Sequence, residues 1–234
     1  MSEPNLEIAA DRDALADLAG KRIEQIIAAT PGADRFSIAL SGGHTPKATY
    51  GRLSARPIPW ERLEVFFGDE RCVAPDVDGS NYKMAKEALF DSVSIPTEQI
   101  HRIRGELSPP DAAAAAAEDL RSVFGEGIPS LDLILLDMGP DGHTASLFPG
   151  SAEVDITEVL TVPVNRPDLP QPWRVSFTLP VLNAAKRVMF LIDGADKAPM
   201  LPRALSHDPA LPSGRVQPAG ELHFLVTEVV AAQL

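Results

Sequence analysis

Cysteine is nearly absent from this chain of 234 residues, in which Cys72 is the only one. A single cysteine excludes a disulfide within the chain and a metal site built from several cysteines, and it is typical of a reducing compartment. Long hydrophobic runs are also missing, since no apolar stretch approaches the roughly 18 residues that a membrane-spanning helix needs. The N-terminal segment is acidic and lacks the basic and apolar regions of a secretory signal. These features predict a soluble, cytoplasmic protein.

The chain contains few positively charged residues relative to its acidic ones. Lysine and arginine total 21 against 33 aspartate and glutamate residues, which gives a formal net charge of −12. A field of this sign repels polyanions, so nucleic acids and anionic membranes are disfavoured as partners. A phosphorylated small molecule would need a local cluster of donors that overcomes this charge.

Several motifs of known chemistry are absent as well. The chain contains neither a G-x-x-x-x-G-K-[ST] phosphate loop nor a G-x-G-x-x-G dinucleotide fingerprint. It also lacks H-E-x-x-H, an EF-hand loop and G-x-S-x-G, which disfavours zinc peptidases, calcium binders and serine esterases of the α/β-hydrolase type. The sequence therefore offers no plausible set of metal ligands.

What the sequence does contain is a regular alternation of apolar runs and helix-like segments. Buried strands are predicted at residues 36–40, 63–67, 131–136, 159–164, 188–192 and 222–227, with a short one at 100–103. Helices are expected over 11–29, from about Lys47, over 82–90, over 111–124 and after Lys197. Continuous apolar strands alternating with helices predict an α/β fold with a mainly parallel, Rossmann-like sheet that helices cover on both faces. We expect one domain, residues 1–234, because no linker or repeat divides the chain.

Four polar, glycine-containing segments each follow one of the predicted strands. They are SGGHTP (41–46), GDER (68–71), GPDGH (139–143) and GADK (194–197). The carboxyl ends of parallel strands meet at one edge of a sheet, where open α/β folds bind their ligands. We therefore expect these four turns to form one site.

The segment SGGHTP has the features of an anion-binding turn. Its candidate residues are Ser41, Gly42, Gly43 and Thr45. Glycines let backbone N–H groups approach an anion closely, and the start of the following helix adds a partial positive charge. The alternative is an ordinary glycine turn, in which Thr45 caps a helix whose first residue is Pro46. The sequence alone leaves both open.

Asp141 and His143 are the candidate catalytic pair. Imidazole titrates near neutral pH, so His143 can take a proton from water, and a nearby carboxylate can fix its tautomer. The structural alternative is a capping aspartate beside a histidine that has no part in catalysis.

Four further charged residues lie on the same predicted edge: Asp69, Arg71, Arg174 and Lys197. Arginine offers a planar fork of donors for ligand oxygens, and lysine adds a positive charge. The alternative for each is a solvated surface charge, worth under about 1 kcal/mol when paired.

Assembled in order, these segments resemble the 6-phosphogluconolactonases, a family within the superfamily of sugar-phosphate isomerases and amino-sugar-phosphate deaminases. The run DGHTASLFPG (141–150) is the most specific, because the deaminases share the DGH but continue with phenylalanine, asparagine, glutamate and proline. The other matching stretches are LSGGHTPKATY (40–50), FFGDERCVAPDVDGSNY (66–82), LDLILLDMGP (131–140), RVSFTLPVLNAAKRVMFLIDGADKA (174–198) and LHFLVT (222–227). Together they cover the chain nearly end to end.

The resemblance implies a carboxylic ester hydrolase that opens 6-phospho-D-glucono-1,5-lactone to 6-phospho-D-gluconate in the oxidative pentose phosphate pathway, without metal or cofactor. It implies that His143 is the general base for the attacking water and that Asp141 orients it. The residues implied to bind substrate are Ser41, Gly42, Gly43 and Thr45 of the phosphate loop, Arg174 and Lys197 as its cationic clamp, and Asp69 and Arg71 at the sugar end.

Two other functions fit parts of the pattern. In an amino-sugar-phosphate isomerase or deaminase, the acid/base glutamate would fall in the run that reads SLFP here, at 146–149. A sugar-phosphate-binding regulatory module would keep the fold without catalysis, although the acidic charge and the lack of a helix-turn-helix argue against a DNA-binding form. The sequence does not fix the oligomeric state, and a monomer is compatible with it.

Two residues depart from the pattern that the resemblance implies. Glu228 stands where an aspartate is common, which is a mild change, and the other is Asp137. Asp137 stands in LLDMG, where the family usually has a glycine. Its carboxylate would either face the substrate phosphate and repel it, or point away and pair with a neighbouring donor. We expect the second arrangement, because an unpaired carboxylate beside an anion site is hard to sustain.

Overall fold

The computed structural model describes residues 4–30 and 35–234, and its centre is a six-stranded parallel sheet. The strand order is β1-β9-β8-β5-β2-β3. The strands are β1 (Asn5–Ala9), β2 (Phe36–Leu40), β3 (Leu63–Phe67), β5 (Leu133–Leu136), β8 (Arg187–Ile192) and β9 (Glu221–Thr227). Every residue of β2, β3 and β5 is buried, as expected for apolar strands covered on both faces. The predicted α/β class and parallel sheet are confirmed.

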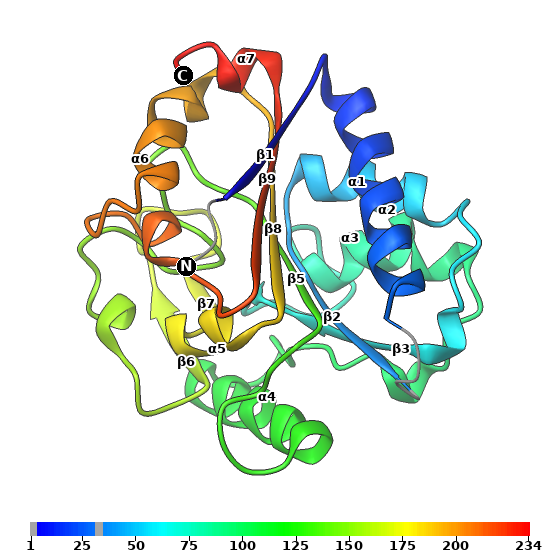
Figure 1. The fold of residues 1–234 in the computed structure, drawn as a ribbon. Coiled ribbons are helices and arrows are strands. Elements are labelled where there is room, and N and C mark those ends of the chain that lie inside the picture. Colours follow the sequence, from blue (N-terminus) through cyan, green and yellow to red (C-terminus); the bar gives the residue numbers. More distant parts are fainter. Residues whose placement is uncertain (1–3, 31–34) are drawn as a thin grey trace.

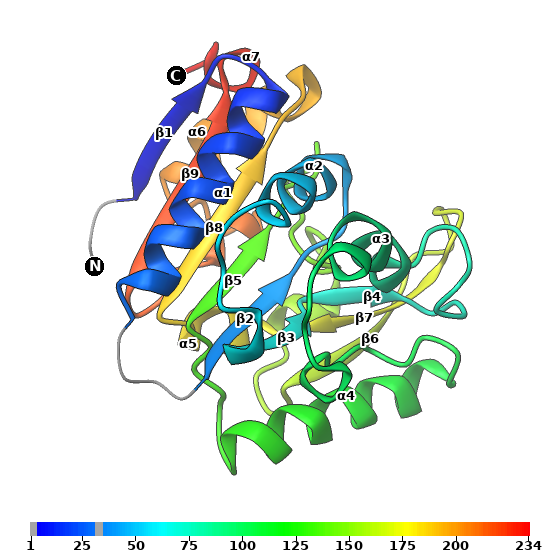
Figure 2. The ribbon, with the colours of Figure 1, turned by 90° about the vertical axis from the view of Figure 1, so that its right-hand side faces the viewer.

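Helices cover both faces of this sheet (Figures 1 and 2). On one side lie α1 (Arg12–Ala28), α2 (His44–Leu53) and α3 (Asn81–Ala88). On the other side lie α5 (Leu179–Ala184), α6 (Leu201–Leu205) and α7 (Glu228–Ala231). Each face has its own hydrophobic core, with Leu15 and Ile23 of α1 in one and Phe190 and Phe224 in the other. That the whole chain forms one domain stays a prediction.

A second sheet was not predicted. It is antiparallel and contains β4 (Asp69–Arg71), β7 (Trp173–Phe177) and β6 (Thr161–Asn165) in the order β4-β7-β6. The segment GDER is therefore not a simple turn, because the chain runs from β3 through Gly68 directly into β4. Helix α4 (Pro109–Phe124) packs against β6 and β7 (Figure 2).

Short 3₁₀ helices complete the described chain. They are η1 (Trp60–Arg62), η2 (Phe90–Ser92), η3 (Thr97–Gln99), η4 (Ala152–Asp155), η5 (Ala195–Met200) and η6 (Ser213–Arg215). The strand expected at 100–103 is wrong, since Ile100 makes only an isolated bridge to Val65. Among the described residues, no helix is long and apolar enough to cross a membrane.

The sheet order brings the predicted turns together. Neighbouring strands β8, β5 and β2 run parallel, and their carboxyl ends lead into GADK, GPDGH and SGGHTP. Helix α2 begins at His44 with Gly43 as its N-cap, so the alternative in which Thr45 caps a helix starting at Pro46 is wrong. The expectation that these turns share one edge is confirmed.

Candidate active site

A cavity of about 200 Å³ lies at the carboxyl edge of the parallel sheet. All the predicted site residues except Asp141 and Thr45 line it. The lining residues are Ser41, Gly42, Gly43, Asp69, Arg71, Asp137, Met138, Gly139, Pro140, His143, Ala145, Arg174 and Lys197. Thr45 is buried in the first turn of α2, and Asp141 lies behind His143.

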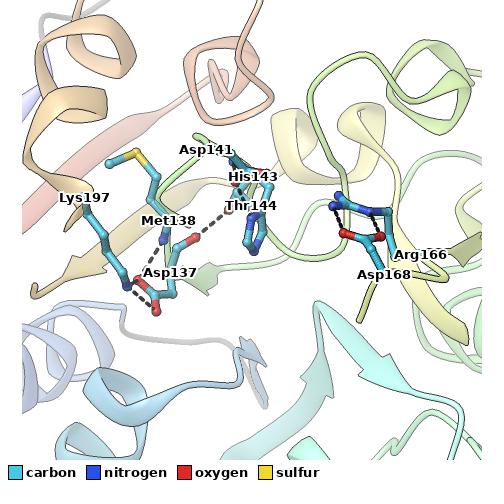
Figure 3. Close-up of polar contacts among 8 residues, drawn as sticks. All are labelled: Asp137, Met138, Asp141, His143, Thr144, Arg166, Asp168 and Lys197. Carbon is cyan, nitrogen blue, oxygen red and sulfur yellow. Dashed lines mark hydrogen bonds and ion pairs between the residues drawn. The ribbon is translucent and has the colours of Figure 1, made fainter. Parts of the chain in front are cut away.

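The turn after β5 holds His143 against Asp141 (Figure 3). The Nδ1 atom of His143 lies 2.6 Å from Oδ1 of Asp141, which also accepts the backbone N–H of His143 at 3.1 Å. The hydrogen bond from His143 lowers the pKa of Asp141 to about 2, so this carboxylate is ionised at neutral pH and can only accept. Nδ1 therefore carries the proton. The other ring nitrogen, Nε2, makes no hydrogen bond with any residue in the described part of the chain.

Two glycines make this turn possible. A Cβ on Gly139 would come within 2.1 Å of Nδ1 and Cε1 of His143. Gly142 has a φ of +83°, in the left-handed region, and a Cβ there would lie 2.8 Å from the Leu211 side chain. The G-P-D-G spacing thus fixes where His143 sits.

The imidazole of His143 also packs on an aromatic ring that the sequence did not single out. The ring centroids of His143 and Phe148 are 4.5 Å apart, and the guanidinium carbon of Arg166 lies 3.9 Å from the Phe148 centroid. Arg166 is held by Asp168 through two hydrogen bonds of 2.9 and 2.7 Å. The two rings are tilted by 38°, so Phe148 contacts both the imidazole and a cation.

The glycine loop is braced from two sides. The hydroxyl of Tyr50 accepts the backbone N–H of Ser41 at 2.9 Å and donates to its carbonyl at 2.8 Å. A Cβ on Gly42 would lie 2.1 Å from Oδ1 of Asn81, so only glycine fits there. Gly43 has a φ of +111°, and no side chain caps the helix that follows it. The N-terminus of α2 is therefore open to an anion.

The two arginines of the cavity have donors without partners. Arg174 is only 8% exposed, and its Nε is buried without a hydrogen-bond partner among the described residues. Its guanidinium carbon lies 5.9 Å from the centroid of the Phe148 ring. Burial lowers the pKa of Arg174. Arg71 donates to the Gly79 carbonyl at 2.5 Å, but its Nε is buried without a partner among the described residues. Because an unpaired buried donor is costly, this pair indicates that an anionic ligand completes the site.

The two acidic residues of GDER, Asp69 and Glu70, point in different directions and have different hydrogen-bond partners. Asp69 accepts hydrogen bonds from Ser146 at 2.6 Å and from Asn81 at 3.1 Å, and it faces the cavity. Glu70 points away and accepts from four donors. Three lie at the start of α3, namely the backbone N–H groups of Asn81 and Tyr82 and the Ser80 hydroxyl, and the fourth is the backbone N–H of Arg71 in β4 itself. Burial raises the pKa of Glu70, and these hydrogen bonds oppose the shift. Sequence reasoning missed Asn81; the Ser-Asn pair that opens α3 was the available signal.

Asp137 follows β5 and meets Lys197 of η5. The Nζ atom lies 2.7 Å from Oδ1 and 2.8 Å from Oδ2 (Figure 3), so the expected pairing with a neighbouring donor is confirmed. The expectation that Asp137 points away is wrong, since both side chains line the cavity. Burial raises the pKa of Asp137, and the charge of Lys197 opposes this shift.

Comparison with known proteins identifies the family. A family profile described as "Glucosamine-6-phosphate isomerases/6-phosphogluconolactonase" matches residues 10–224. The chain belongs to this family. A 6-phosphogluconolactonase from Nostoc is 41% identical over 207 residues, 86% of this chain and 85% of the relative. One from Rattus norvegicus is 38% identical over 231 residues, 94% of this chain and 88% of the relative.

A solved member of the family has the same fold. The structure of 6-phosphogluconolactonase from Trypanosoma cruzi matches with a TM-score of 0.89 at 30% identity, covering 100% of this chain and 98% of that one. These matches confirm the predicted family and the prediction of an enzyme. The individual roles of the predicted site residues stay predictions.

The candidate active site of this chain contains two kinds of chemical group. Asp141 and His143 provide a carboxylate-oriented imidazole, while Lys197, Arg174 and Arg71 provide positive charge. No cluster of three or more histidine, cysteine, aspartate or glutamate side chains in the described ranges could hold a metal ion. The groups present suit proton transfer to or from an anionic substrate.

Proposed function

We propose that this protein hydrolyses 6-phospho-D-glucono-1,5-lactone to 6-phospho-D-gluconate, with His143 as the general base. The observation that carries the proposal is the pairing of His143 with the ionised carboxylate of Asp141. Nε2 of His143 has no hydrogen-bond partner among the described residues, and the same cavity holds Arg71 and Arg174, whose Nε atoms also lack one there. The names of the relatives support the substrate. A cytoplasmic location stays a prediction.

The chemistry needs one proton carrier. Nε2 of His143 takes a proton as a water oxygen bonds to the lactone carbonyl carbon, and Asp141 stabilises the imidazolium that forms. The bond from this carbon to the ring oxygen then breaks, and His143 returns its proton to that oxygen, which becomes a hydroxyl. The new carboxylic acid releases its proton to solvent. The negative charge that develops on the carbonyl oxygen is stabilised by the positive charges of the cavity.

The remaining hydrogen-bond donors of the cavity are proposed to bind the phosphate of the substrate. We assign it to the loop of Ser41, Gly42 and Gly43 at the start of α2, together with Arg174 and Lys197. Thr45 would act through its place in the first turn of α2, because its side chain does not line the cavity. Asp69 and Arg71 are assigned to the sugar hydroxyls.

The amino-sugar-phosphate deaminase alternative has less support. Within the SLFP run, Ser146 donates to Asp69 and Phe148 packs against His143, so this segment brings no carboxylate to the imidazole. Ammonia release from glucosamine 6-phosphate is the measurement that would favour it.

A turnover assay tests the proposal. Freshly generated phospholactone is expected to disappear faster with micromolar enzyme than by its own hydrolysis, and unphosphorylated gluconolactone is expected to be a poor substrate. No acceleration over background would refute the lactonase. Binding of 6-phosphogluconate without turnover would support the regulatory module in its place.

A further inference from the structure

The positive charge that Lys197 brings to the active site is already paired within the chain. Its Nζ lies within hydrogen-bonding distance of both carboxylate oxygens of Asp137. The two side chains are only 14% and 22% exposed, so solvent screens the pair weakly. Figure 3 shows them facing each other, on the opposite side of Asp137 from His143. The Nε of Arg174, in contrast, has no hydrogen-bond partner among the described residues.

The Asp137 carboxylate also lies against the glycine loop. Its Oδ2 is 3.0 Å from the position that a Cβ would take on Gly43, the N-cap of α2. The N-terminus of a helix favours negative charge, and Asp137 supplies it there. A carboxylate of the chain therefore sits between Lys197 and α2, in the region to which the proposed function assigns the substrate phosphate.

This carboxylate is anchored independently of Lys197. The backbone N–H of Met138 donates to Oδ1 at 2.7 Å, and the Thr144 hydroxyl donates to the carbonyl of Asp137 at 2.8 Å. The carboxylate of Asp137 thus has a donor in its own turn besides Lys197, and its backbone is held by Thr144. An incoming phosphate has to share the ammonium group of Lys197, which has three N–H donors, with a fixed negative charge.

We propose that Asp137 is a specificity-determining residue: it competes with the substrate phosphate for Lys197 and so reduces the preference of the site for phosphorylated over unphosphorylated sugar ligands. The proposal rests on the proposed function only in requiring that a phosphate binds beside Lys197. Neutralising Asp137 then strengthens phosphate binding, and it does so only while Lys197 is present. Ligands without a phosphate are unaffected.

Binding measurements separate this role from catalysis. Isothermal titration calorimetry would compare 6-phosphogluconate with gluconate, which lacks the phosphate. Asp137→Asn keeps the shape and an acceptor for Met138, and it is expected to tighten 6-phosphogluconate about tenfold and leave gluconate unchanged. The gain is expected to shrink at high salt. Asp196→Asn is the matched control, because Asp196 is an exposed neighbour of Lys197 and the net charge changes equally.

A double-mutant cycle tests whether the effect of Asp137 depends on Lys197. In a Lys197→Met background, Asp137→Asn is expected to give no tightening. Tightening of the same size without Lys197, or an equal effect from Asp196→Asn, would overturn the proposal. So would unchanged or weaker 6-phosphogluconate binding in folded Asp137→Asn, which would make Asp137 a group that positions Lys197. Asp137→Gly provides the same test should the asparagine variant not fold.

The two proposals fail differently. If the wild type neither hydrolyses the phospholactone nor binds 6-phosphogluconate, the proposed function and this inference both fall. If the wild type hydrolyses the phospholactone and binds 6-phosphogluconate, but Asp137→Asn leaves the affinity ratio of the two ligands unchanged, only the inference falls.

Discussion

At the scale of single residues, the two cations proposed to bind phosphate differ in the partners that they have within the chain. Lys197 is paired with Asp137, whereas the Nε of Arg174 is buried without a hydrogen-bond partner among the described residues. We expect Arg174→Ala to raise KM for the phospholactone with little change in kcat, because a phosphate contact acts alike in ground and transition states. The loss is expected to be about 1.5–3 kcal/mol, and larger than for Lys197→Ala.

Steady-state kinetics of both variants would check this order. Arg104→Ala serves as a control, since Arg104 is exposed and does not line the cavity. A collapse of kcat at unchanged KM would instead place Arg174 at the reacting carbon.

Gly139 gives a second test at this scale. A Cβ at this position would overlap the His143 ring, which can move only by leaving Asp141. Gly139→Ala is therefore expected to fold and to lose activity by about 10²-fold, the effect of a displacement near 1 Å. Gly51→Ala is the matched control, because a Cβ there meets no atom within 4 Å. Full activity of Gly139→Ala would show that the Asp141 contact is dispensable.

At the scale of elements, the start of α3 anchors β4 and with it two cavity residues, Asp69 and Arg71. Glu70 joins these elements by accepting from four donors. In Glu70→Gln one oxygen becomes an NH₂ group that faces donors, and leaving them unsatisfied costs about 1–3 kcal/mol. We expect Tm to fall by about 2–4 °C for each kcal/mol.

Thermal unfolding followed by circular dichroism would measure the shift. Glu87→Gln removes the same charge from the exposed side of α3 and is expected to change stability by less than about 0.5 kcal/mol. Equal Tm values for the two variants would mean that Glu70 does not anchor β4.

The elements that the sequence predicted are those whose burial shows in their own residues. FSIAL, which is apolar except for Ser37, forms β2, and VMFLI, which is apolar throughout, makes up β8 after Arg187. The segment Asp69–Arg71 is fully charged, so nothing local marks it as the strand β4. Its burial depends on donors from Ser146 and α3, which lie far away in the sequence. The edge strand β1 was not predicted from the sequence, because only Ala9 among its residues is buried and the segment has no continuous apolar run.

The site was predictable to the same extent. Turn residues at strand ends, such as Gly43, His143 and Lys197, follow from the alternation of strands and helices and from the resemblance. Asn81 and Phe148 could not be found in this way, because their roles arise from packing against Gly42 and His143 in the folded chain.

At the scale of the whole molecule, the proposed reaction needs no metal ion. The described residues contain no cluster suited to hold one, and the proposed proton transfers use only His143. Dialysis against EDTA, followed by the turnover assay, is expected to leave the rate unchanged. A loss of activity that added Mg²⁺ or Zn²⁺ restores would require a different mechanism.

The central claim is that one imidazole performs the chemistry while other groups hold the phosphate. The most direct test is His143→Asn, assayed for phospholactone turnover and for 6-phosphogluconate binding. We predict that kcat falls by about 10²–10⁴, the range expected for loss of a general base, while the dissociation constant of 6-phosphogluconate stays within a few-fold of wild type. A folded His143→Asn protein that keeps most of its turnover would contradict the account.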